Sequence, residues 1–377
     1  MVRVGILGGG QLALMTAEAA PALGVEVVVL EREPGSPASR AAEEIVGDWR
    51  DESARAKLAE RCDLITLENE FVDAEALRWL VERGCPVYPT PDTVRTIQDK
   101  LCQKQALASA GLPVAPFRPV ESAQDVEHSA RELGWPLVLK ARRNGYDGYG
   151  NATLRGQADV GPALAKLGRG TSAGGAGGLY VEAWAPFEGE LAVMVARNRR
   201  GDVAAFPVVE TVQQNHICHE VVVPARVPAD VAERARAAAV AAVEAVGGIG
   251  VTGVELFLLP GGQILVNELA PRPHNSGHYS IEGCRTSQFA NHLLGVLDRP
   301  LGSTDLLKPG VAMVNLLGTK NGPADPRVEQ RIPGTYVHLY GKRDVRVGRK
   351  MGHVTALADT PGAALALARR AASLVVW

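Results

Sequence analysis

The segment from residue 254 to 278 constrains the fold more than any other, because it places two glutamates in one apolar hairpin. It reads VELFLLPGGQILVNELAPRPHNSGH. Gly261 and Gly262 suit the two-residue loop of a β-hairpin between apolar runs. With that loop, Glu255 lies directly opposite Glu268. The segment therefore predicts an antiparallel strand pair that carries two facing carboxylates.

Two facing carboxylates need a compensating charge. Directly opposed side chains have Cβ atoms roughly 4.5–5.5 Å apart, and like charges at that spacing are destabilising. Burial adds to the cost, because we expect these apolar side chains to share the glutamates' face: Phe257, Leu259, Ile264 and Val266. A buried carboxylate pair either shares a proton or holds a cation. Facing oxygen ligands suit Mg²⁺, which is commonly bound by one or two carboxylates together with substrate phosphates.

The composition favours a globular protein that acts on small molecules. The 377 residues are 46% hydrophobic and 22% charged, which predicts two or three domains with a sizeable core. The net charge of −2 and the absence of basic runs give no sign of nucleic-acid or membrane binding. Five scattered cysteines without CxxC spacing favour reduced thiols. With no signal-peptide pattern and no apolar run near about 18 residues, we expect a cytoplasmic protein.

Residues 1–105 alternate strands and helices, which predicts a doubly wound, Rossmann-like domain. The pattern predicts strands at residues 3–8, 25–31 and 64–72, and helices at residues 11–23 and from residue 73. The first turn fits G-x-G-x-x-A, and Glu31 follows at the distance of a ribose-binding acid. A nicotinamide-dependent oxidoreductase is therefore an alternative. Glycine-rich first turns also bind simple phosphates at helix N-termini, or serve only as tight turns.

A lysine beside a glycine-rich loop is the main feature of the next region, residues 106–181. The strand PLVLK ends at Lys140 and is followed by NGYDGYGN. Such a lysine can act as a phosphate clamp while N–H groups of the loop approach the anion. A solvated lysine at a strand end is the alternative. The later run GRGTSAGGAGG lacks a P-loop lysine and is typical of a connector.

The order of Lys140, Glu190, Glu255 and Glu268 along the chain resembles the ATP-grasp superfamily. The resemblance implies two α+β lobes, residues 106–181 and 182–377, that hold ATP between them. It also implies roles in binding ATP and Mg²⁺ for the following residues: Lys140 at the phosphates, Glu182 and Ala183 at the adenine linker, Glu190 at the ribose, Lys100 and Asn267 as further nucleotide contacts, and Glu255 and Glu268 as metal ligands.

Longer motifs make the chain similar to the N5-carboxyaminoimidazole ribonucleotide synthase family of purine biosynthesis. They are GGGQL, LENE, QDKLCQKQ, NGYDGYG, VNELAPRPHNSGH and GKRDVRVGRKMGH, and together they span nearly the whole chain. The resemblance implies a ligase that uses ATP and bicarbonate to carboxylate 5-aminoimidazole ribonucleotide through carboxyphosphate, with release of ADP and phosphate. It further implies a homodimer and a substrate-binding segment near the C-terminus, where we expect short strands and a helix at residues 360–373.

The same resemblance assigns catalytic and substrate-binding residues. Asp147 is expected to be the base that takes a proton from the attacking amine. Asn275 and His278 are expected near the bicarbonate and the transferred phosphoryl group, with a capping asparagine and a core histidine as the alternatives. Contacts to the ribonucleotide are expected from Gly10, Gln11, Glu68 (or Glu70), Tyr146, Tyr149, Lys342 and Arg349.

Two motifs depart from the family pattern. The glycine loop of the family usually reads GGYDG followed by Arg or Lys, whereas Asn144 and Tyr149 stand at the first and last of these places. Tyrosine brings no charge, so phosphate binding could shift to Arg142 or Arg143. Lys100 replaces a family arginine and keeps its charge without the planar fork. Another ATP-grasp ligase, using formate or an amino acid, and a protein that binds without catalysis are therefore further alternatives.

Overall fold

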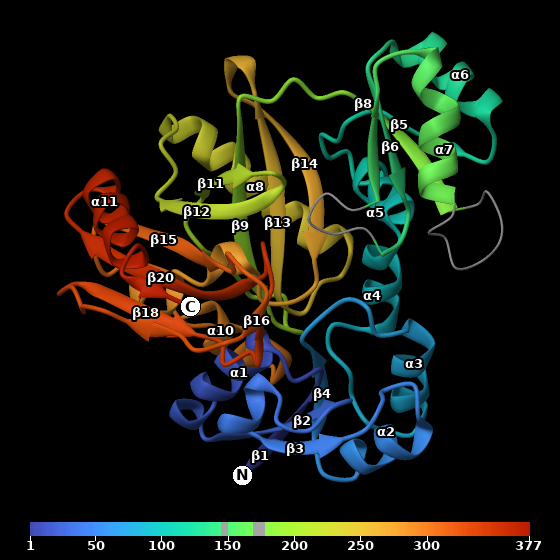
Figure 1. Cartoon of the computed structure of the whole chain (residues 1–377). Helices are drawn as coiled ribbons and strands as arrows, with labels where there is room; N and C mark the ends of the chain where they lie inside the picture. The colour runs from blue at the N-terminus through green and yellow to red at the C-terminus, as the bar shows by residue number, and fades with distance from the viewer. Residues whose placement is uncertain (145–149, 169–177) are drawn as a thin grey trace.

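The computed structural model describes residues 1–144, 150–168 and 178–377. Three large sheets organise these residues, and Figure 1 shows them as the blue N-terminal domain, the green lobe at the upper right and the long central sheet that continues into the red C-terminal strands. The expected glycine-loop residues Tyr146, Asp147 and Tyr149, and most of the expected connector, lie outside the described residues. Within the described ranges, no helix has the length and apolar character needed to cross a bilayer.

The N-terminal domain is a parallel sheet with strand order β3-β2-β1-β4. Its strands are β1 (Val2–Leu7), β2 (Val25–Glu31), β3 (Glu43–Val46) and β4 (Leu64–Leu67), and its helices are α1 (Gln11–Ala19), α2 (Glu52–Ala59) and α3 (Ala74–Glu82). Asp51 and Asp73 cap the helices that follow them by accepting backbone N–H bonds. The doubly wound prediction is confirmed, although β4 ends before Glu68, so that residues 68–72 are not strand as expected.

Two helices, α4 (Pro91–Gln98) and α5 (Lys100–Ser109), lead from this domain to the smaller lobe (Figure 1). The smaller lobe is a sheet of order β5-β8-β6-β7, with α6 and α7 packed on its outer face. Its elements are β5 (Phe117–Val120), α6 (Ala123–Leu133), β6 (Leu137–Ala141), β7 (Asn151–Leu154), α7 (Val160–Gly168) and β8 (Leu179–Ala183). A capping box between Ser122 and Asp125 fixes the start of α6.

The large sheet has the order β14-β13-β9-β11-β12-β15-β20-β18, and β10 pairs with β9. Its strands are β9 (Gly189–Arg197), β10 (Val203–Ala205), β11 (Val209–Gln214), β12 (Ile217–Val223), β13 (Gly250–Leu259), β14 (Gln263–Ala270), β15 (Gly310–Leu317), β18 (Thr335–Leu339) and β20 (Lys350–Ala358). Since β12 pairs with β15, the strands after residue 310 extend the same sheet. Short pairs join β16 (Gly322–Pro323) to β19 (Asp344–Val345) and β17 (Arg327–Val328) to β21 (Val375–Val376).

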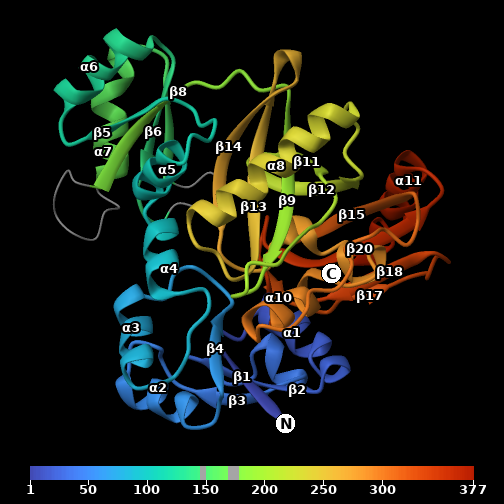
Figure 2. The ribbon, with the colours of Figure 1, turned by 180° about the vertical axis from the view of Figure 1, so that it is seen from behind.

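Helices cover both faces of the large sheet. They are α8 (Ala229–Ala245), α9 (Ser280–Gly283), α10 (Gln288–Val296) and α11 (Pro361–Ala372). Figure 2 shows α8 lying across β9, β13 and β14, where it buries the apolar face of these strands. The helix α11 packs on β15 and β20. The terminal helix expected at residues 360–373 is thus confirmed within one residue at each end.

The expected pairing of Glu255 with Glu268 is confirmed, although the turn differs from the expectation. The turn holds three residues, Pro260–Gly262, and this shifts the neighbouring register by one residue. A β-bulge leaves Asn267 without a partner on β13 and shifts the register back. The two differences cancel at the glutamates.

The bulge also changes which side chains share the glutamates' face. Ile264 and Val266 lie on the opposite face, in the core formed with α8, so their expected position was wrong. The reason is that the alternation of side chains skips one residue at the bulge. Phe257 lies on the glutamates' face and stacks on Phe187 with ring centroids 4.5 Å apart.

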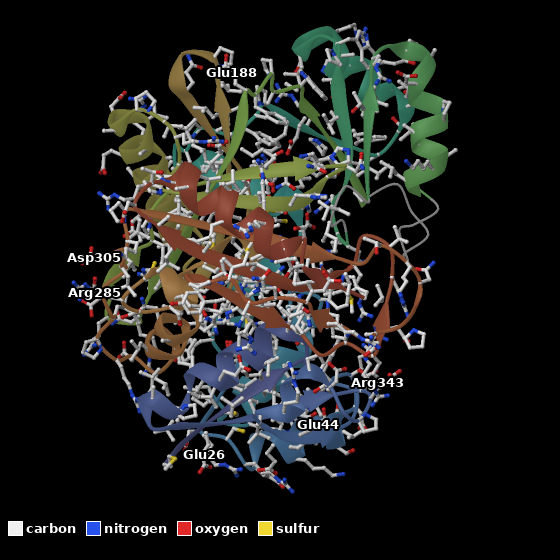
Figure 3. All side chains as sticks on the ribbon, turned by 60° about the vertical axis from the view of Figure 1, so that its left-hand side comes forward. Glu26, Glu44, Glu188, Arg285, Asp305 and Arg343 are labelled. Carbon is white, nitrogen blue, oxygen red and sulfur yellow. The ribbon has the colours of Figure 1, made fainter. Side chains whose placement is uncertain are left out.

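The C-terminal strands contact the N-terminal domain directly. The Arg343 guanidinium donates to the carbonyl of Pro34, and Arg40 Nη2 donates to the carbonyl of Leu339 at 3.3 Å. Figure 3 shows Arg343 beside Glu44, at the junction between the two regions. This junction brings the segment after residue 340 close to the first turn of the chain.

The packing of α8 on β13 generates a stability prediction. Leu256 is 1% exposed and lies in this core, so Leu256→Ala should lower the free energy of unfolding by about 2–5 kcal/mol, as measured by urea denaturation. The control Val347→Ala, at a side chain that is 68% exposed, should change it by less than about 0.5 kcal/mol. Equal effects of the two substitutions would contradict the assignment of this core.

Candidate active site

The facing carboxylates of Glu255 and Glu268 lie beside one lysine and one histidine, and burial, with the charge of Arg272, lowers the pKa of the histidine, His274, to about 3. Lys100 Nζ is 2.5 Å from Glu268 Oε2, and His274 Nε2 is 3.4 Å from Glu255 Oε1. Burial and the charge of Glu268 raise the pKa of Glu255 to about 8. Burial acts in the same sense on Glu268, but Lys100 and then Lys140 outweigh it and lower its pKa. At neutral pH with no cation bound, Glu255 therefore carries a proton and Glu268 keeps the charge that pairs with Lys100.

The donor set around these carboxylates fits a divalent cation. Asn267 Oδ1 is buried beside them and has no hydrogen-bond partner among the described residues. Glu190 lies on the same face of the sheet, two residues along β9 from the partner of Glu255. Burial raises the pKa of Glu190, as does the charge of Glu268. Across the described ranges, no group of three or more His, Cys, Asp or Glu side chains could hold a metal ion, so the two carboxylates would leave most coordination positions of a cation to other oxygen ligands.

Lys140 lies in a buried ionic cluster. Its Nζ is 2.7 Å from Glu182 Oε2, and Lys104 Nζ is 3.2 Å from Glu182 Oε1. The Tyr180 hydroxyl donates to Glu182 Oε1 at 3.0 Å. Burial works against a charged Glu182, but Lys104 and Lys140 together hold its pKa at about 2. Lys140 is 13% exposed, so the alternative of a solvated strand-end lysine is wrong.

The expected adenine linker lies at the end of β8. The backbone N–H of Ala183 donates to the carbonyl of Pro116 at 2.8 Å, so it is already engaged. The Glu182 side chain points to the buried lysines. A role for this segment in binding adenine stays a prediction.

The first turn of the chain presents its amides to carboxylates. The N–H of Gly9 donates to Glu31 Oε2 at 2.9 Å, and the N–H of Gly10 donates to Glu68 Oε2. A side chain at Gly10 would collide with the Glu68 carboxylate, so this close approach requires glycine. Gln11 begins α1 directly after it. The structure thus brings Gly10, Gln11 and Glu68 together, and a phosphate could reach the Gly10 amide only by displacing Glu68.

The two glutamates of LENE have different partners. Glu70 forms a two-point ion pair with Arg272, with Nε–Oε2 and Nη2–Oε1 distances of 2.5 and 3.0 Å. The Glu68 carboxylate accepts a hydrogen bond from the Gly10 amide and, among the described residues, has no arginine partner like that of Glu70. Glu68 is therefore the freer of the two to contact a substrate. The choice of Glu68 over Glu70 stays a prediction that this difference supports.

Lys342 lies close enough to Glu68 for their charges to interact. Burial, with the charge of Arg349, lowers the pKa of Lys342 to about 8, and burial raises the pKa of Glu68 to about 7. Lys342 Nζ donates to the carbonyl of Lys350 at 2.7 Å, and Arg349 Nη1 donates to the carbonyl of Asp344 at 3.0 Å. The structure therefore brings together three of the residues expected to bind the ribonucleotide.

His278 does not lie beside the carboxylates. It is fully buried, its Nδ1 is 3.0 Å from Gln288 Nε2, and its ring packs on Phe289 and His353. Burial lowers its pKa well below the usual value, so the ring is neutral. This burial favours the core-histidine alternative, and the expected place of His278 near bicarbonate stays a prediction.

Asn275 exchanges amide hydrogen bonds with Asn315, at 2.9 and 2.7 Å. His274, not Asn275, occupies the capping position of the turn. The pair ties the turn after β14 to β15, which fixes the position of His274. Contact of Asn275 with a substrate stays a prediction.

Arg142 and Arg143, which could replace the cation missing from the glycine loop, differ in how tightly they are held by Asp99. Arg142 forms a two-point ion pair with Asp99, the residue that caps α5. Arg143 is 52% exposed and lies 3.7 Å from the same carboxylate. Of the two, Arg143 is the better candidate to contact a phosphate.

A cavity of about 340 Å³ adjoins the metal-ligand candidates and opens between the N-terminal domain and the lobes. Its lining includes Phe71, Gln98, Lys100, Arg143, Asn144 and Glu268. The volume lies at the lower end of the range found for ligand sites. The cavity therefore offers space beside Glu268 for a small ligand.

Sequence reasoning did not assign Arg272, His274 or Lys104 to the site. The first two lie in the quoted motif, four and six residues after Glu268, and spacing alone did not show that the chain turns back toward the carboxylates. Lys104 carried a usable signal, because it lies four residues after Lys100 and therefore on the same face of α5.

Comparisons with known proteins relate this geometry to characterised families. Family models match a ribonucleotide synthetase preATP-grasp domain at residues 1–98, an ATP-grasp domain at residues 105–289 and a phosphoribosylaminoimidazole carboxylase C-terminal domain at residues 311–367. The chain is 45% identical over 357 residues to the N5-carboxyaminoimidazole ribonucleotide synthase of Synechococcus elongatus, covering 93% of this chain and 88% of the relative.

Two further matches span nearly all of the chain. A phosphoribosylaminoimidazole carboxylase of Schizosaccharomyces pombe is 41% identical over 368 residues, which cover 95% of this chain and 65% of the relative. The crystal structure of N5-carboxyaminoimidazole synthase from Aspergillus clavatus in complex with ADP and 5-aminoimidazole ribonucleotide matches with a TM-score of 0.88 at 36% identity, covering 99% and 98% of the two chains.

The pair between Arg272 and Glu70 generates a prediction about the stability of the site. Arg272→Met leaves the Glu70 carboxylate in a half-buried place without its partner, so the free energy of unfolding should fall by about 3 kcal/mol in urea denaturation. The control Arg327→Met removes an exposed pair with Asp325 and should cost less than about 1 kcal/mol. If both variants lose the same free energy, the pair does not join the N-terminal domain to the site.

Proposed function

Because the chain belongs to the N5-carboxyaminoimidazole ribonucleotide synthase family, we propose that it catalyses the ATP-dependent carboxylation of 5-aminoimidazole ribonucleotide by bicarbonate. The products are N5-carboxyaminoimidazole ribonucleotide, ADP and phosphate. One observation carries the proposal in this chain: Glu255 and Glu268 face each other, and Glu268 forms an ion pair with Lys100 and lies within electrostatic reach of Lys140. Two carboxylates for a metal and two ammonium groups for phosphates suit a triphosphate in complex with Mg²⁺.

The first step of the proposed reaction makes bicarbonate reactive. A bicarbonate oxygen attacks the γ-phosphorus of ATP, ADP leaves, and the resulting carboxyphosphate breaks down to CO₂ and phosphate. Lys140 and Lys100 would hold the phosphates in line for this attack, since positioning supplies most of the catalysis in phosphoryl transfer. Mg²⁺ held by Glu255 and Glu268, with Asn267 Oδ1 beside them, would supply charge neutralisation at the phosphate oxygens.

The second step joins CO₂ to the aminoimidazole. The amine attacks the carbon of CO₂ and loses a proton, for which we propose Asp147 as the base. Lys342 and Arg349 would bind the phosphate of the ribonucleotide, and Glu68 lies within electrostatic reach of Lys342 to contact the same substrate. Arg143 would supply the loop charge that Tyr149 lacks.

The remaining alternatives have less support. A nicotinamide oxidoreductase would use Glu31 at a ribose, yet the Glu31 carboxylate already accepts a hydrogen bond from the Gly9 N–H. This alternative also does not explain why Glu255 and Glu268 face each other. Another ATP-grasp ligase would share the site around Glu268, but the comparisons place the chain with carboxylating relatives along more than nine-tenths of its length. The expected cytoplasmic location and homodimer stay predictions.

Turnover of ATP tests the proposed function. With Mg²⁺, the purified protein should release ADP only when both 5-aminoimidazole ribonucleotide and bicarbonate are present, measured by a coupled assay for ADP. Replacing bicarbonate by formate, or the ribonucleotide by an amino acid, should leave only background release. ADP release with formate at a comparable rate would favour the other class of ATP-grasp ligase.

The metal-ligand assignment has its own control in the same assay. The double variant Glu255→Gln, Glu268→Gln keeps the size of both side chains and removes both charges, so ADP release should fall by at least about 10³-fold. Nucleotide cleavage that survives this change would contradict the assignment.

The pKa of Lys342 generates a prediction about pH. Its folded value is lowered to about 8, so the ammonium is charged below that pH and loses its charge as the pH rises through it. The value of kcat/KM for 5-aminoimidazole ribonucleotide should therefore fall above about pH 8, whereas Lys342→Arg, which stays charged, should remove this fall. The KM for ATP serves as the internal control. An identical decline in the arginine variant would show that another group is responsible.

A further inference from the structure

Lys104 is a buried lysine that the proposed reaction does not use. It lies on α5, four residues after Lys100, and is 2% exposed. Lysine is almost never buried to this extent unless it is paired. Its Nζ lies 3.2 Å from Glu182 Oε1 and donates to the carbonyl of Val266 at 3.3 Å. One ammonium group therefore contacts a strand of the smaller lobe and a strand of the large sheet.

We propose that Lys104 is a positioning residue for ATP, which holds Glu182 so that Lys140 can turn to the phosphates, and which fixes β8 against β14 beside Glu268. The inference rests on the proposed nucleotide site at Lys140 and Glu268. At 2% exposure Lys104 has no open surface for ATP, so it acts through the residues that it binds.

The charges around Glu182 support the first part of the proposal. Glu182 is 3% exposed and has two lysines, Lys104 on one carboxylate oxygen and Lys140 on the other. A buried carboxylate with one lysine would hold that lysine tightly, because separation would leave an unpaired buried charge. With Lys104 in place, Glu182 keeps a counter-charge when Lys140 moves. Lys140 then has charge to offer to an anionic triphosphate.

The backbone contacts of Val266 support the second part. Its carbonyl accepts from Lys104, and its N–H donates to the carbonyl of Pro113 at 2.7 Å. Both polar groups of this residue are thus held by the region that leads into the smaller lobe. Asn267 and Glu268 follow directly in the chain. Lys104 therefore fixes the start of the bulge that sets the metal-ligand candidates.

A double-mutant cycle tests the proposal, with the Kd for ATP in the presence of Mg²⁺ measured by titration calorimetry. Lys104→Met removes the charge and keeps the length of the stem, and it should raise this Kd by at least about tenfold. Lys104→Arg keeps the charge, so it should bind ATP more tightly than Lys104→Met even though the guanidinium is larger than the ammonium that it replaces. The matched control Lys57→Met, at an exposed lysine on α2, should leave the Kd unchanged.

The Glu182→Gln background separates positioning from a general loss of structure. If Lys104 acts through Glu182 as well as through Val266, adding Lys104→Met to Glu182→Gln should raise the Kd for ATP by clearly less than it does in the unchanged background, and the remaining effect measures the contact with the Val266 carbonyl. The KM for 5-aminoimidazole ribonucleotide should change by less than about threefold in Lys104→Met. An equal effect on ATP binding in both backgrounds, or a Kd within twofold of the original in Lys104→Met, overturns the proposal.

Failure to fold is also decisive. If Lys104→Met does not fold but the double variant with Glu182→Gln does, the loss came from the unpaired carboxylate, as proposed. If neither folds, the charge of Lys104 is needed for folding independently of Glu182, and the proposal is overturned. Because the Kd for ATP needs no turnover, failure of the proposed carboxylation in the unchanged protein is visible separately.

Discussion

The arrangement of the whole site follows from one constraint: two carboxylates that face each other repel, and nearby cations must offset this repulsion. Glu255 and Glu268 come from neighbouring strands, and no residue of the hairpin itself neutralises them. The cations come from elsewhere: Lys100 from the start of α5 and Lys140 from the end of β6. The smaller lobe, the linking helices and the large sheet therefore meet where the negative charge is. Their arrangement places a cationic surface opposite a site that suits a metal.

The N-terminal domain and the C-terminal strands are joined to this centre by ionic contacts as well as by apolar packing. Arg272 follows β14 and reaches Glu70 in the N-terminal domain. Lys342, from the C-terminal strands, lies within electrostatic reach of Glu68 at the end of β4. The two glutamates of LENE thus face two different parts of the site. Glu70 lies on the side of the metal-ligand candidates, and Glu68 lies on the side proposed for the ribonucleotide. The proposed ribonucleotide site is therefore formed by regions far apart in the sequence.

Much of this arrangement could be predicted from sequence, because period-two and glycine patterns mark the strands and turns. The facing of Glu255 and Glu268 was predicted correctly although neither the extra turn residue nor the bulge at Asn267 was foreseen, since a bulge leaves no local signal in side-chain pattern. The helix α8 was not foreseen, because its buried positions are largely alanines such as Ala235 and Ala239, which contrast weakly with the exposed face. The burial of His278 and the pairing of Lys140 with Glu182 depend on tertiary packing, which cannot be predicted from the spacing of residues along the chain.

The bulge at Asn267 separates the two ends of the glutamate hairpin. On the tip side, Gly261 faces open space, and Arg234 of α8 donates to the carbonyl of Gly262. On the other side, Glu255 is kept in register by its ladder with β9. Alignment of the carboxylates is thus anchored from the sheet interior. A fluorophore attached at Gly261 would therefore report on the hairpin without changing the spacing of the acidic pair.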